Sequence, residues 1–310
     1  MKKSKKATTI AILLVFLIGL SLLAYPLVSD QWNKMHQTRA IISHAESIAK
    51  MSEEECAALR SAADEFNASL FGIENRWKLA EDVRETYESL LICDETRVIS
   101  YIEIPKIGVS LPIYHGTGSA VLQTAIGHME GTSLPVGGAG THCVLSGHRG
   151  LPSAKLFTDL DKLVEGDQFM LYTLDQTLTY EVDQIHIVVP SDMSTLALNS
   201  TDDQVTLFTC TPYGINTHRL MVHAHRVQTE SANEVLITSE AIQIDQKMVA
   251  LCIAIPTVFI LFLFAVLRPR KKALPEDEEE ADRPPEKRKR RKDKPSKKKK
   301  APEEPIPEPV

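Results

Sequence analysis

The stretch QVTLFTCTPYG, residues 204–214, carries the clearest structural signal in this chain. Its first residues are mostly apolar or β-branched, and the chain then breaks at Pro212 and Gly214, which predicts a short strand that ends at Cys210. Two further reactive side chains stand beside predicted strand ends. His148 follows the apolar run at 142–146, and Arg219 opens the run at 219–227. A thiol, an imidazole and a guanidinium are therefore all available at strand ends.

The surrounding region has the period-two pattern of a β-rich domain, beginning near residue 97. Many short strands separated by Pro and Gly turn signals favour a closed barrel over a parallel sheet, so the predicted class is mainly β with short helices. The predicted strands cover residues 98–104, 109–113, 142–146, 168–173, 178–189, 204–209 and 219–227, with helical pieces at 119–126 and 153–163.

Two apolar stretches lie outside this β-rich region. Residues 10–28 and 248–267 contain no charged side chain, and each is about long enough to cross a bilayer. Lysines at 2, 3, 5 and 6 precede the first stretch, and four basic residues within 268–272 follow the second. The positive-inside rule therefore places both termini in the cytoplasm and the middle of the chain on the other side of the membrane. No small-x-small cleavage site follows the first stretch, so we expect an uncleaved anchor.

The charge is distributed unevenly along the chain, whose formal net charge is −6. Residues 268–310 carry 16 Lys/Arg and 11 Asp/Glu, and the first six residues carry four Lys. Subtracting these from the totals of 35 and 41 leaves 15 basic and 30 acidic residues over 7–267. This strongly acidic exported part disfavours nucleic-acid binding, which needs a positive surface.

Composition divides the chain into seven segments. The Ala-, Glu- and Leu-rich part after the first span predicts two helices that join near Gly72, and the Lys-, Glu- and Pro-rich tail has too few apolar residues to fold. A solvated tail is favoured, and contact of its basic blocks with anionic lipid headgroups is the alternative. We expect a cytoplasmic N-terminus (1–9), a transmembrane helix (10–28), a helical stalk or lid region (29–96), a β-barrel (97–230), a linker (231–247), a second transmembrane helix (248–267) and a disordered cytoplasmic tail (268–310).

Four of the five cysteines, at 56, 93, 143 and 210, lie in the exported part, and Cys252 lies in the second span. A disulfide that spares Cys210 is one interpretation, since exported proteins often contain disulfides. However, a domain of this size buries enough apolar surface without cross-links. The alternation around Cys143 predicts a buried strand residue.

Five sequence blocks in a fixed order closely resemble the sortases, in particular the pilin-polymerising class C sortases of Gram-positive bacteria. The resemblance covers about residues 98–227, and the second apolar span also resembles class C. The blocks are YIEIPKI (101–107), LPIYHG (111–116), GHMEGTSLPVGG (127–138), SGHRGLPSAKLF (146–157) and TLFTCTPYG (206–214).

The resemblance implies an eight-stranded sortase β-barrel and the catalytic residues Cys210, His148 and Arg219. It implies that Cys210 attacks the Thr–Gly carbonyl of an LPxTG-like sorting signal and holds the pilin as a thioester. A lysine amine of another pilin subunit would then accept it, forming an isopeptide bond. The implied partners are pilins with such signals, the acceptor lysine and the cell membrane, with the catalytic domain extracellular.

The chemistry of these side chains fits those roles independently. A cysteine is a strong nucleophile only as the thiolate, which a nearby cation favours. His148 suits proton transfer to the leaving amine and from the incoming amine. Arg219 is permanently charged and therefore suits a clamp on the substrate or the oxyanion better than a base.

No cofactor or metal is expected. His223 and His225 share one strand face and are candidate metal ligands, but no Asp, Glu or Cys lies at a suitable local spacing, so ordinary surface imidazoles are favoured.

One feature departs from the class C pattern. Class C sortases typically carry an Asp-Pro-aromatic lid before the barrel, and no such tripeptide occurs in this chain. The family pattern would place the lid at residues 71–77, so an atypical lid or no lid is expected.

Several functions stay open on the sequence alone. A sortase that anchors surface proteins to peptidoglycan would use the same catalytic residues with a different acceptor amine. A hydrolase would resolve the thioester with water, and a non-catalytic exported scaffold is the remaining alternative. The sequence leaves open the sorting-signal variant, the acceptor and the oligomeric state.

Overall fold

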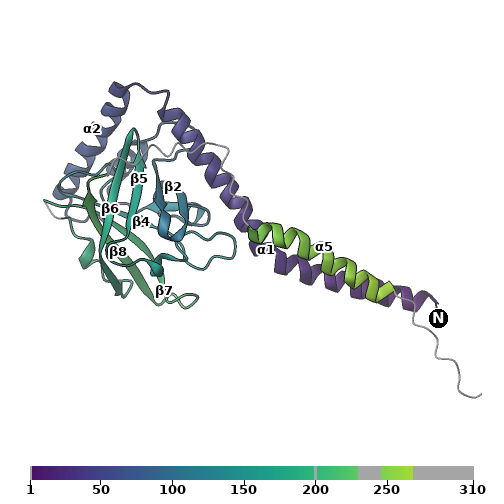
Figure 1. Cartoon of the computed structure of the whole chain (residues 1–310). Helices are drawn as coiled ribbons and strands as arrows, with labels where there is room; N and C mark the ends of the chain where they lie inside the picture. Colours follow the sequence, from purple (N-terminus) through teal and green to yellow (C-terminus); the bar gives the residue numbers. More distant parts are fainter. Residues whose placement is uncertain (1, 199–200, 230–245, 268–310) are drawn as a thin grey trace, which may run out of the picture. The chain divides into compact units, whose positions relative to one another are not determined.

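Eight short strands close into a barrel, which confirms the predicted β class (Figure 1). The computed structural model describes residues 2–198, 201–229 and 246–267; the predicted tail at 268–310 and most of the predicted linker at 231–247 lie outside these ranges. The strands are β1 (Ser100–Ile104), β2 (Val109–His115), β3 (Ile126–His128), β4 (Thr141–Ser146), β5 (Gln168–Thr173), β6 (Gln176–Val188), β7 (Asp203–Thr211) and β8 (His218–Val227).

The strand order around the barrel is β1-β2-β3-β4-β7-β8-β6-β5, and β5 pairs with β1 to close it. Six of the eight pairings are antiparallel, whereas β2 with β3 and β4 with β7 are parallel. Alternate residues fill the interior, as the two-residue period of a strand requires. Along β7, for example, Val205, Leu207 and Thr209 are buried in the barrel.

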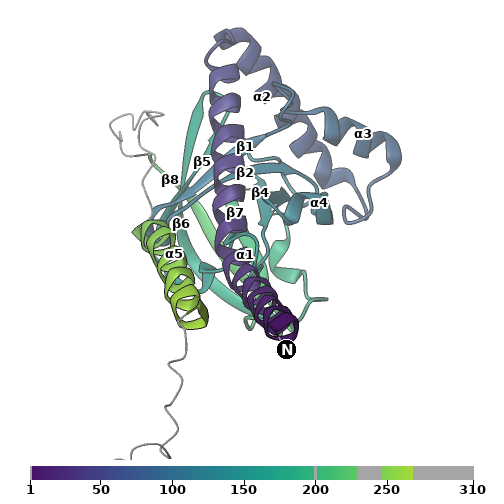
Figure 2. The same cartoon turned by 90° about the vertical axis from the view of Figure 1, so that its right-hand side faces the viewer.

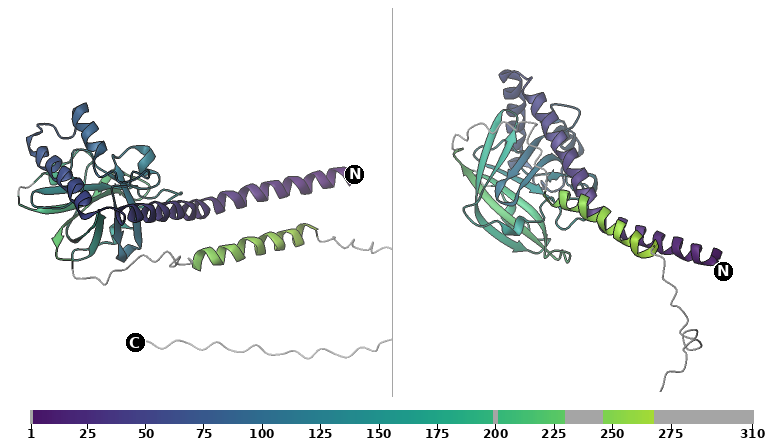
Figure 3. Two further views of the ribbon diagram at one scale, coloured as in Figure 1. Left: turned by 90° about the horizontal axis from the view of Figure 1, so that it is seen from above. Right: turned by 45° about the vertical axis from the view of Figure 1, so that its right-hand side comes forward.

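Helices precede the barrel and follow it. They are α1 (Lys2–Ile48), α2 (Glu53–Ser69), α3 (Glu81–Ser89), α4 (Ser119–Leu122) and α5 (Gln246–Leu267), with 3₁₀ turns η1 (Leu70–Gly72), η2 (Pro105–Ile107), η3 (Leu160–Lys162) and η4 (Ser194–Leu196). The C-terminal half of α1 crosses the barrel over β2 (Figure 2), and its N-terminal half projects away from it (Figure 3).

The helical region has one helix break more than predicted. The predicted join near Gly72 is present, because α2 ends at Ser69, η1 ends at Gly72 and α3 begins at Glu81. The first span and the first stalk helix form one continuous helix, α1, and the additional break separates it from α2, which begins at Glu53. The reason is local: the Ser52 hydroxyl accepts a hydrogen bond from Glu55 N, and the Glu55 carboxylate accepts one from Ser52 N. This capping box starts α2. The predicted helices at 119–126 and 153–163 are shorter than expected, and the three-residue strand β3 was not predicted.

One helix in the described part of the chain is long and apolar enough to cross a membrane, and it lies within α1 at Thr9–Ile48. Its most apolar stretch has a mean hydropathy of 2.6 and none of it is buried against the protein. The second predicted span falls within α5, whose described apolar part, Ile253–Phe264, is shorter than a membrane span.

A buried polar cluster joins α3 to the barrel. The Tyr87 hydroxyl lies 2.9 Å from His128 Nδ1 and accepts a hydrogen bond from Gly116 N at 3.0 Å. His128 Nε2 lies 2.8 Å from the Ser133 carbonyl oxygen, so Nε2 carries the proton and donates it. Burial lowers the pKa of His128 to about 4, which keeps the imidazole neutral at physiological pH.

We expect the barrel domain to lose stability as the pH falls from about 6.5 towards 4. Because the pKa of His128 is about 4 in the folded state and near 6.5 in an unfolded chain, the unfolded state takes up the proton first. The free energy of unfolding therefore falls by up to roughly 3 kcal/mol across this window. Urea unfolding at several pH values measures this effect. Replacing His128 with Gln should make the free energy of unfolding depend less on pH. An unchanged pH dependence would contradict the attribution of this effect to His128.

Candidate active site

The three predicted catalytic residues lie at one end of neighbouring strands. Because β4 and β7 are parallel and pair Ser146 with Phe208, the chain leaves both strands at the same end of the barrel. His148 follows β4 by two residues, and Cys210 lies two residues beyond Phe208. Cys210 pairs with Arg219 of the antiparallel strand β8. The structure thus brings together residues that are far apart in the sequence.

Hydrogen bonds join the chain at the end of β4 to the end of β7. Gly147 N donates to the Phe208 carbonyl oxygen at 3.1 Å, and Thr209 Oγ1 donates to the Gly147 carbonyl oxygen at 2.7 Å. Two residues further along each segment, Arg149 Nη1 donates to Thr211 Oγ1 at 3.2 Å. These bonds flank His148 and Cys210 on both sides. They fix the spacing between the two backbones that carry the imidazole and the thiol.

Arg149 was not identified from the sequence, although its position next to His148 is a usable signal. Its side chain is only 9% exposed and also pairs with the Asp161 carboxylate. A buried guanidinium that bonds to both the Cys210 strand and the 159–163 turn ties these elements together.

Two glycines allow this close approach. A Cβ added to Gly147 would lie 2.6 Å from Ile126 Cδ1 and 2.7 Å from Phe157 Cδ2. Gly150 has φ +78°, and a Cβ there would lie 2.9 Å from the ring of Tyr213. Both positions require glycine, because no side chain fits between the strand ends and their neighbours.

Cys210, His148 and Arg219 are all half-buried, so a reactant has access to each. In the described part of the chain, no hydrogen bond or ion pair joins the three side chains. Arg219 Nη1 donates to the carbonyl oxygens of Asn216 and His218, at 3.1 Å each. A guanidinium has five N–H donors, so this anchoring leaves others to bind a reacting oxygen.

The surface beside Cys210 is the outer face of β4, β7 and β8. Since side chains alternate along a strand, Thr206 and Phe208 share this face with Cys210. Phe208 packs beside a small apolar cluster of Val144, Met221 and Leu196 of η4. Val144, Met221 and Leu196 are fully buried, whereas Phe208 is partly exposed. The cluster thus packs the turn η4, here called the wall, against the strands.

A chain of polar contacts through Thr206 lies on the same face of the barrel. The His142 ring lies 3.0 Å from the Ala197 carbonyl oxygen through Nδ1, so Nδ1 donates and Nε2 accepts from Thr206 Oγ1 at 2.7 Å. Thr206 Oγ1 in turn lies 2.7 Å from His223 Nδ1. Burial lowers the pKa of both histidines, that of His223 to about 4. The network is neutral and holds the wall at Ala197.

The two histidines considered as metal ligands have separate partners. His223 belongs to the network with Thr206, whereas His225 Nδ1 lies 3.3 Å from Asp183 Oδ2.

The segment expected at the lid position contacts the wall through Arg76. Arg76 Nη1 donates to the Gly131 carbonyl oxygen at 3.2 Å, and Nη2 donates to the Leu196 carbonyl oxygen. The guanidinium also stacks on Trp77, 4.3 Å from the ring centroid. Within the described residues, no hydrogen bond or ion pair joins positions 71–77 to Cys210, His148 or Arg219. Neither Arg76 nor the His142 network has a local sequence signal that identifies it.

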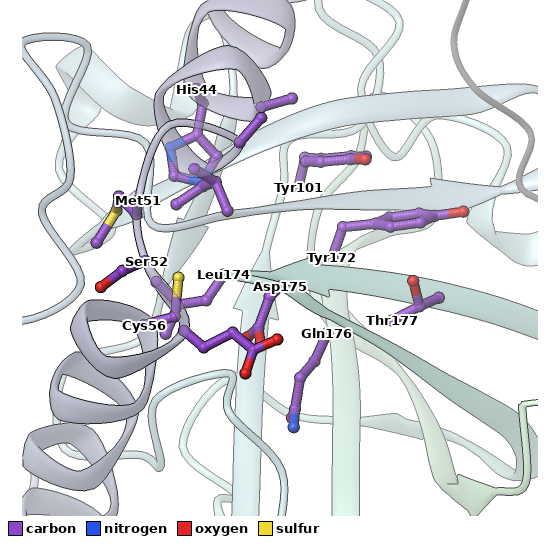
Figure 4. A pocket seen from close by; sticks show the side chains of 14 residues that line it. His44, Met51, Ser52, Cys56, Tyr101, Tyr172, Leu174, Asp175, Gln176 and Thr177 are labelled. Atoms are coloured by element: carbon purple, nitrogen blue, oxygen red, sulfur yellow. The ribbon is translucent and has the colours of Figure 1, made fainter.

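A separate cavity of about 350 Å³ lies between the α1–α2 corner and strands β1, β5 and β6 (Figure 4). His44, Cys56, Tyr101, Tyr172 and Asp175 line it, and none of the three predicted catalytic residues does. Cys56, Cys93, Cys143 and Cys210 are all unpaired. Burial raises the pKa of the Cys143 thiol well above its usual value, so Cys143 is unsuited to be a nucleophile.

Comparisons with known proteins agree on one family. Residues 102–227 match the sortase domain. The chain is 33% identical to sortase D of Bacillus subtilis over 129 residues, which cover 41% of this chain and 62% of that relative. The matched region thus spans less than two thirds of the length of this curated relative.

Solved structures match over a larger share of their length. Sortase C1 from Streptococcus agalactiae has 47% identity and a TM-score of 0.60, covering 62% of this chain and all of the other. Sortase C of Streptococcus pneumoniae has 40% identity and a TM-score of 0.56, covering 63% and 99%. The latter structure was described in relation to catalysis and pilin substrate specificity.

We expect Gly147→Ala to destabilise the barrel domain by about 1–3 kcal/mol, as overpacking of a tight contact does. The added methyl group has to displace Ile126 or Phe157, and the displacement moves the start of the His148 loop. Urea unfolding measures the effect. Gly118→Ala is the matched control, since nothing lies within 4 Å of a Cβ at Gly118. Equal stabilities of the two variants would argue against the tight contact.

Proposed function

The chain belongs to the sortase family of cysteine transpeptidases, and on this premise we propose that it is a membrane-anchored sortase of class C. It cleaves an LPxTG-like sorting signal between Thr and Gly and transfers the pilin to a lysine amine of another pilin. The observation that carries the proposal is the pairing of Cys210 with Arg219 across β7 and β8, with His148 leaving the adjacent strand at the same end.

The proposed reaction has two steps. The Cys210 thiolate attacks the Thr carbonyl carbon, and Arg219 binds the oxyanion that develops, or the adjacent substrate backbone. The C–N bond to Gly breaks as His148 donates a proton to the departing amine, which leaves a thioester. A neutral lysine amine then attacks the thioester carbon, His148 accepts its proton, and the thiolate leaves as the isopeptide bond forms.

The partly exposed side chain of Phe208 supports a peptide substrate over a small molecule. Phe208 lies two residues before Cys210 on the same face of β7. An extended peptide placed along β7 would contact this apolar side chain and bring one carbonyl to the thiol.

A pilin acceptor is favoured over peptidoglycan because the similar structures include sortase C proteins at 40–47% identity over nearly their whole length. Peptidoglycan anchoring remains the second candidate, and the identity of the acceptor product separates the two.

The proposed location is the cell membrane, with the catalytic domain extracellular and both termini cytoplasmic. The unburied apolar stretch of α1 supports an N-terminal anchor. The apolar helix α5 and the basic residues that flank both helices support a second span that returns the chain to the cytoplasm.

We expect mass spectrometry to detect a covalent acyl-enzyme at Cys210 when the protein is incubated with a pilin that bears an LPxTG-type signal. It should resolve into lysine-linked pilin dimers, whereas Cys210→Ala should yield no adduct. Arg219→Ala should slow acylation roughly 100-fold, by analogy with the loss of an oxyanion donor. An adduct that yields only a peptidoglycan-amine product would favour the anchoring function. The absence of any adduct in the unaltered protein would contradict the proposal.

We further propose that residues 71–77 form an atypical lid that does not plug the thiol. Arg76 bonds to the backbone at Gly131 and Leu196, and this supports a clamp on the wall. Deletion of residues 71–77 should leave the rate of Cys210 alkylation by iodoacetamide within about 2-fold, since a clamp on the wall leaves the thiol accessible. A marked increase in that rate would mean that the segment covers the thiol.

A further inference from the structure

The part of α1 that follows the apolar stretch touches the barrel through polar side chains. Asp30, Asn33 and Gln37 recur at the spacing of three to four residues that places them on one face of a helix. Each bonds to the backbone of a barrel loop. Lys155 N donates to Asp30 Oδ1 at 2.9 Å, Asn33 Nδ2 donates to the Ser153 carbonyl oxygen at 2.8 Å, and Gln37 Nε2 donates to the Thr124 carbonyl oxygen at 2.6 Å.

Two of these three bonds reach the loop that carries His148, which spans residues 147–159. The loop is closed on itself by three further bonds. Phe157 N donates to the His148 carbonyl oxygen at 3.2 Å, Gly150 N donates to Thr158 Oγ1 at 3.2 Å, and Thr158 N donates to the Lys155 carbonyl oxygen at 2.9 Å. A displacement at Ser153 or Lys155 is therefore transmitted to the backbone of His148.

The contact depends on these hydrogen bonds because little apolar packing accompanies them. A cavity of about 200 Å³, lined by Asp30, Gln37 and Lys155, lies along this contact. A second cavity of about 300 Å³, lined by Asn33, Gln37 and Thr124, also adjoins it. Close apolar packing of α1 begins only at Ile41, which is 3% exposed.

We propose that α1 is a positioning element of the active site as well as an anchor: Asp30 and Asn33 hold the His148 loop in its reactive position. The inference rests on the proposed function, since it concerns the geometry of His148 relative to Cys210. Asp30 and Asn33 are positioning residues, because they act through the loop and touch neither the thiol nor the substrate.

The physical requirement for such support is strict. A displacement of about 1 Å in a catalytic group is enough to cost roughly 100-fold in rate. The 208–211 strand end holds the loop on one side, through Gly147 and Arg149. Asp30 and Asn33 hold its far side, so the imidazole is supported from two directions.

The test uses the full chain in lipid nanodiscs and the double variant Asp30→Ala, Asn33→Ala. The kcat for acylation by a short LPxTG-type peptide should fall roughly 10-fold or more, whereas KM should stay within about 2-fold, because the peptide-binding face is unchanged. Hydrogen–deuterium exchange of the peptides that cover residues 149–158 should become faster, since Lys155 N loses its acceptor.

Gln37→Ala is the matched control. It removes a helix–barrel hydrogen bond of the same kind, but one that ends at Thr124 rather than on the His148 loop. It should leave kcat and the exchange of residues 149–158 unchanged. Asp30→Asn should restore most of the kcat lost in Asp30→Ala, because its amide oxygen still accepts from Lys155 N.

Three results would overturn the proposal: an unchanged kcat in the double variant, an equal loss in Gln37→Ala, or a loss confined to KM. Exchange is measured without substrate and therefore separates this proposal from the proposed function. If the unaltered chain forms no acyl-enzyme while exchange of the loop still responds only to Asp30 and Asn33, the function is wrong and the structural link stands. If the exchange does not respond, the link itself is wrong.

Discussion

The parallel pairing of β4 with β7 is the constraint on which the active site depends. Antiparallel neighbours would send the two chain exits to opposite ends of the sheet, but the pairing of Ser146 with Phe208 sends both to the same end. The exit of β4 carries His148 and that of β7 carries Cys210, while the antiparallel strand β8 returns Arg219 to the same level. The grouping of the three proposed catalytic residues is thus a consequence of strand direction and register.

Two buried imidazoles of the barrel are neutral, hydrogen-bonded units. His128 and His142 each donate one ring nitrogen to a carbonyl oxygen and accept a hydrogen bond at the other, so neither requires a charge. Their lowered pKa values follow from the same burial. Arg149 differs from them, because its guanidinium is charged and pairs with the Asp161 carboxylate.

Much of the barrel could be predicted from the sequence, because its strands have the two-residue period and clear turn signals. The predicted strand at 168–173 coincides with β5, and the placement of Cys210 and Arg219 at strand ends agrees with β7 and β8. The three-residue strand β3 is too short to show the two-residue period of a strand. The continuity of α1 was missed because Asp30 marks the end of the apolar run without ending the helix. Arg149, Arg76 and the His142 network depend on contacts across the fold, which no local pattern encodes.

The continuity of α1 also sets the distance between the His148 loop and the membrane surface. With α1 in a bilayer, Asp30 lies only about 3 Å along the helix axis beyond Val28, the last residue of the apolar run. The His148 loop bound to Asp30 is therefore held at the level of the lipid headgroups, which extend several ångströms on each side of the hydrocarbon. Partners that are themselves embedded in the membrane would meet this site by lateral diffusion. Their number per unit area of membrane, rather than their concentration in solution, would then govern how often the enzyme acts.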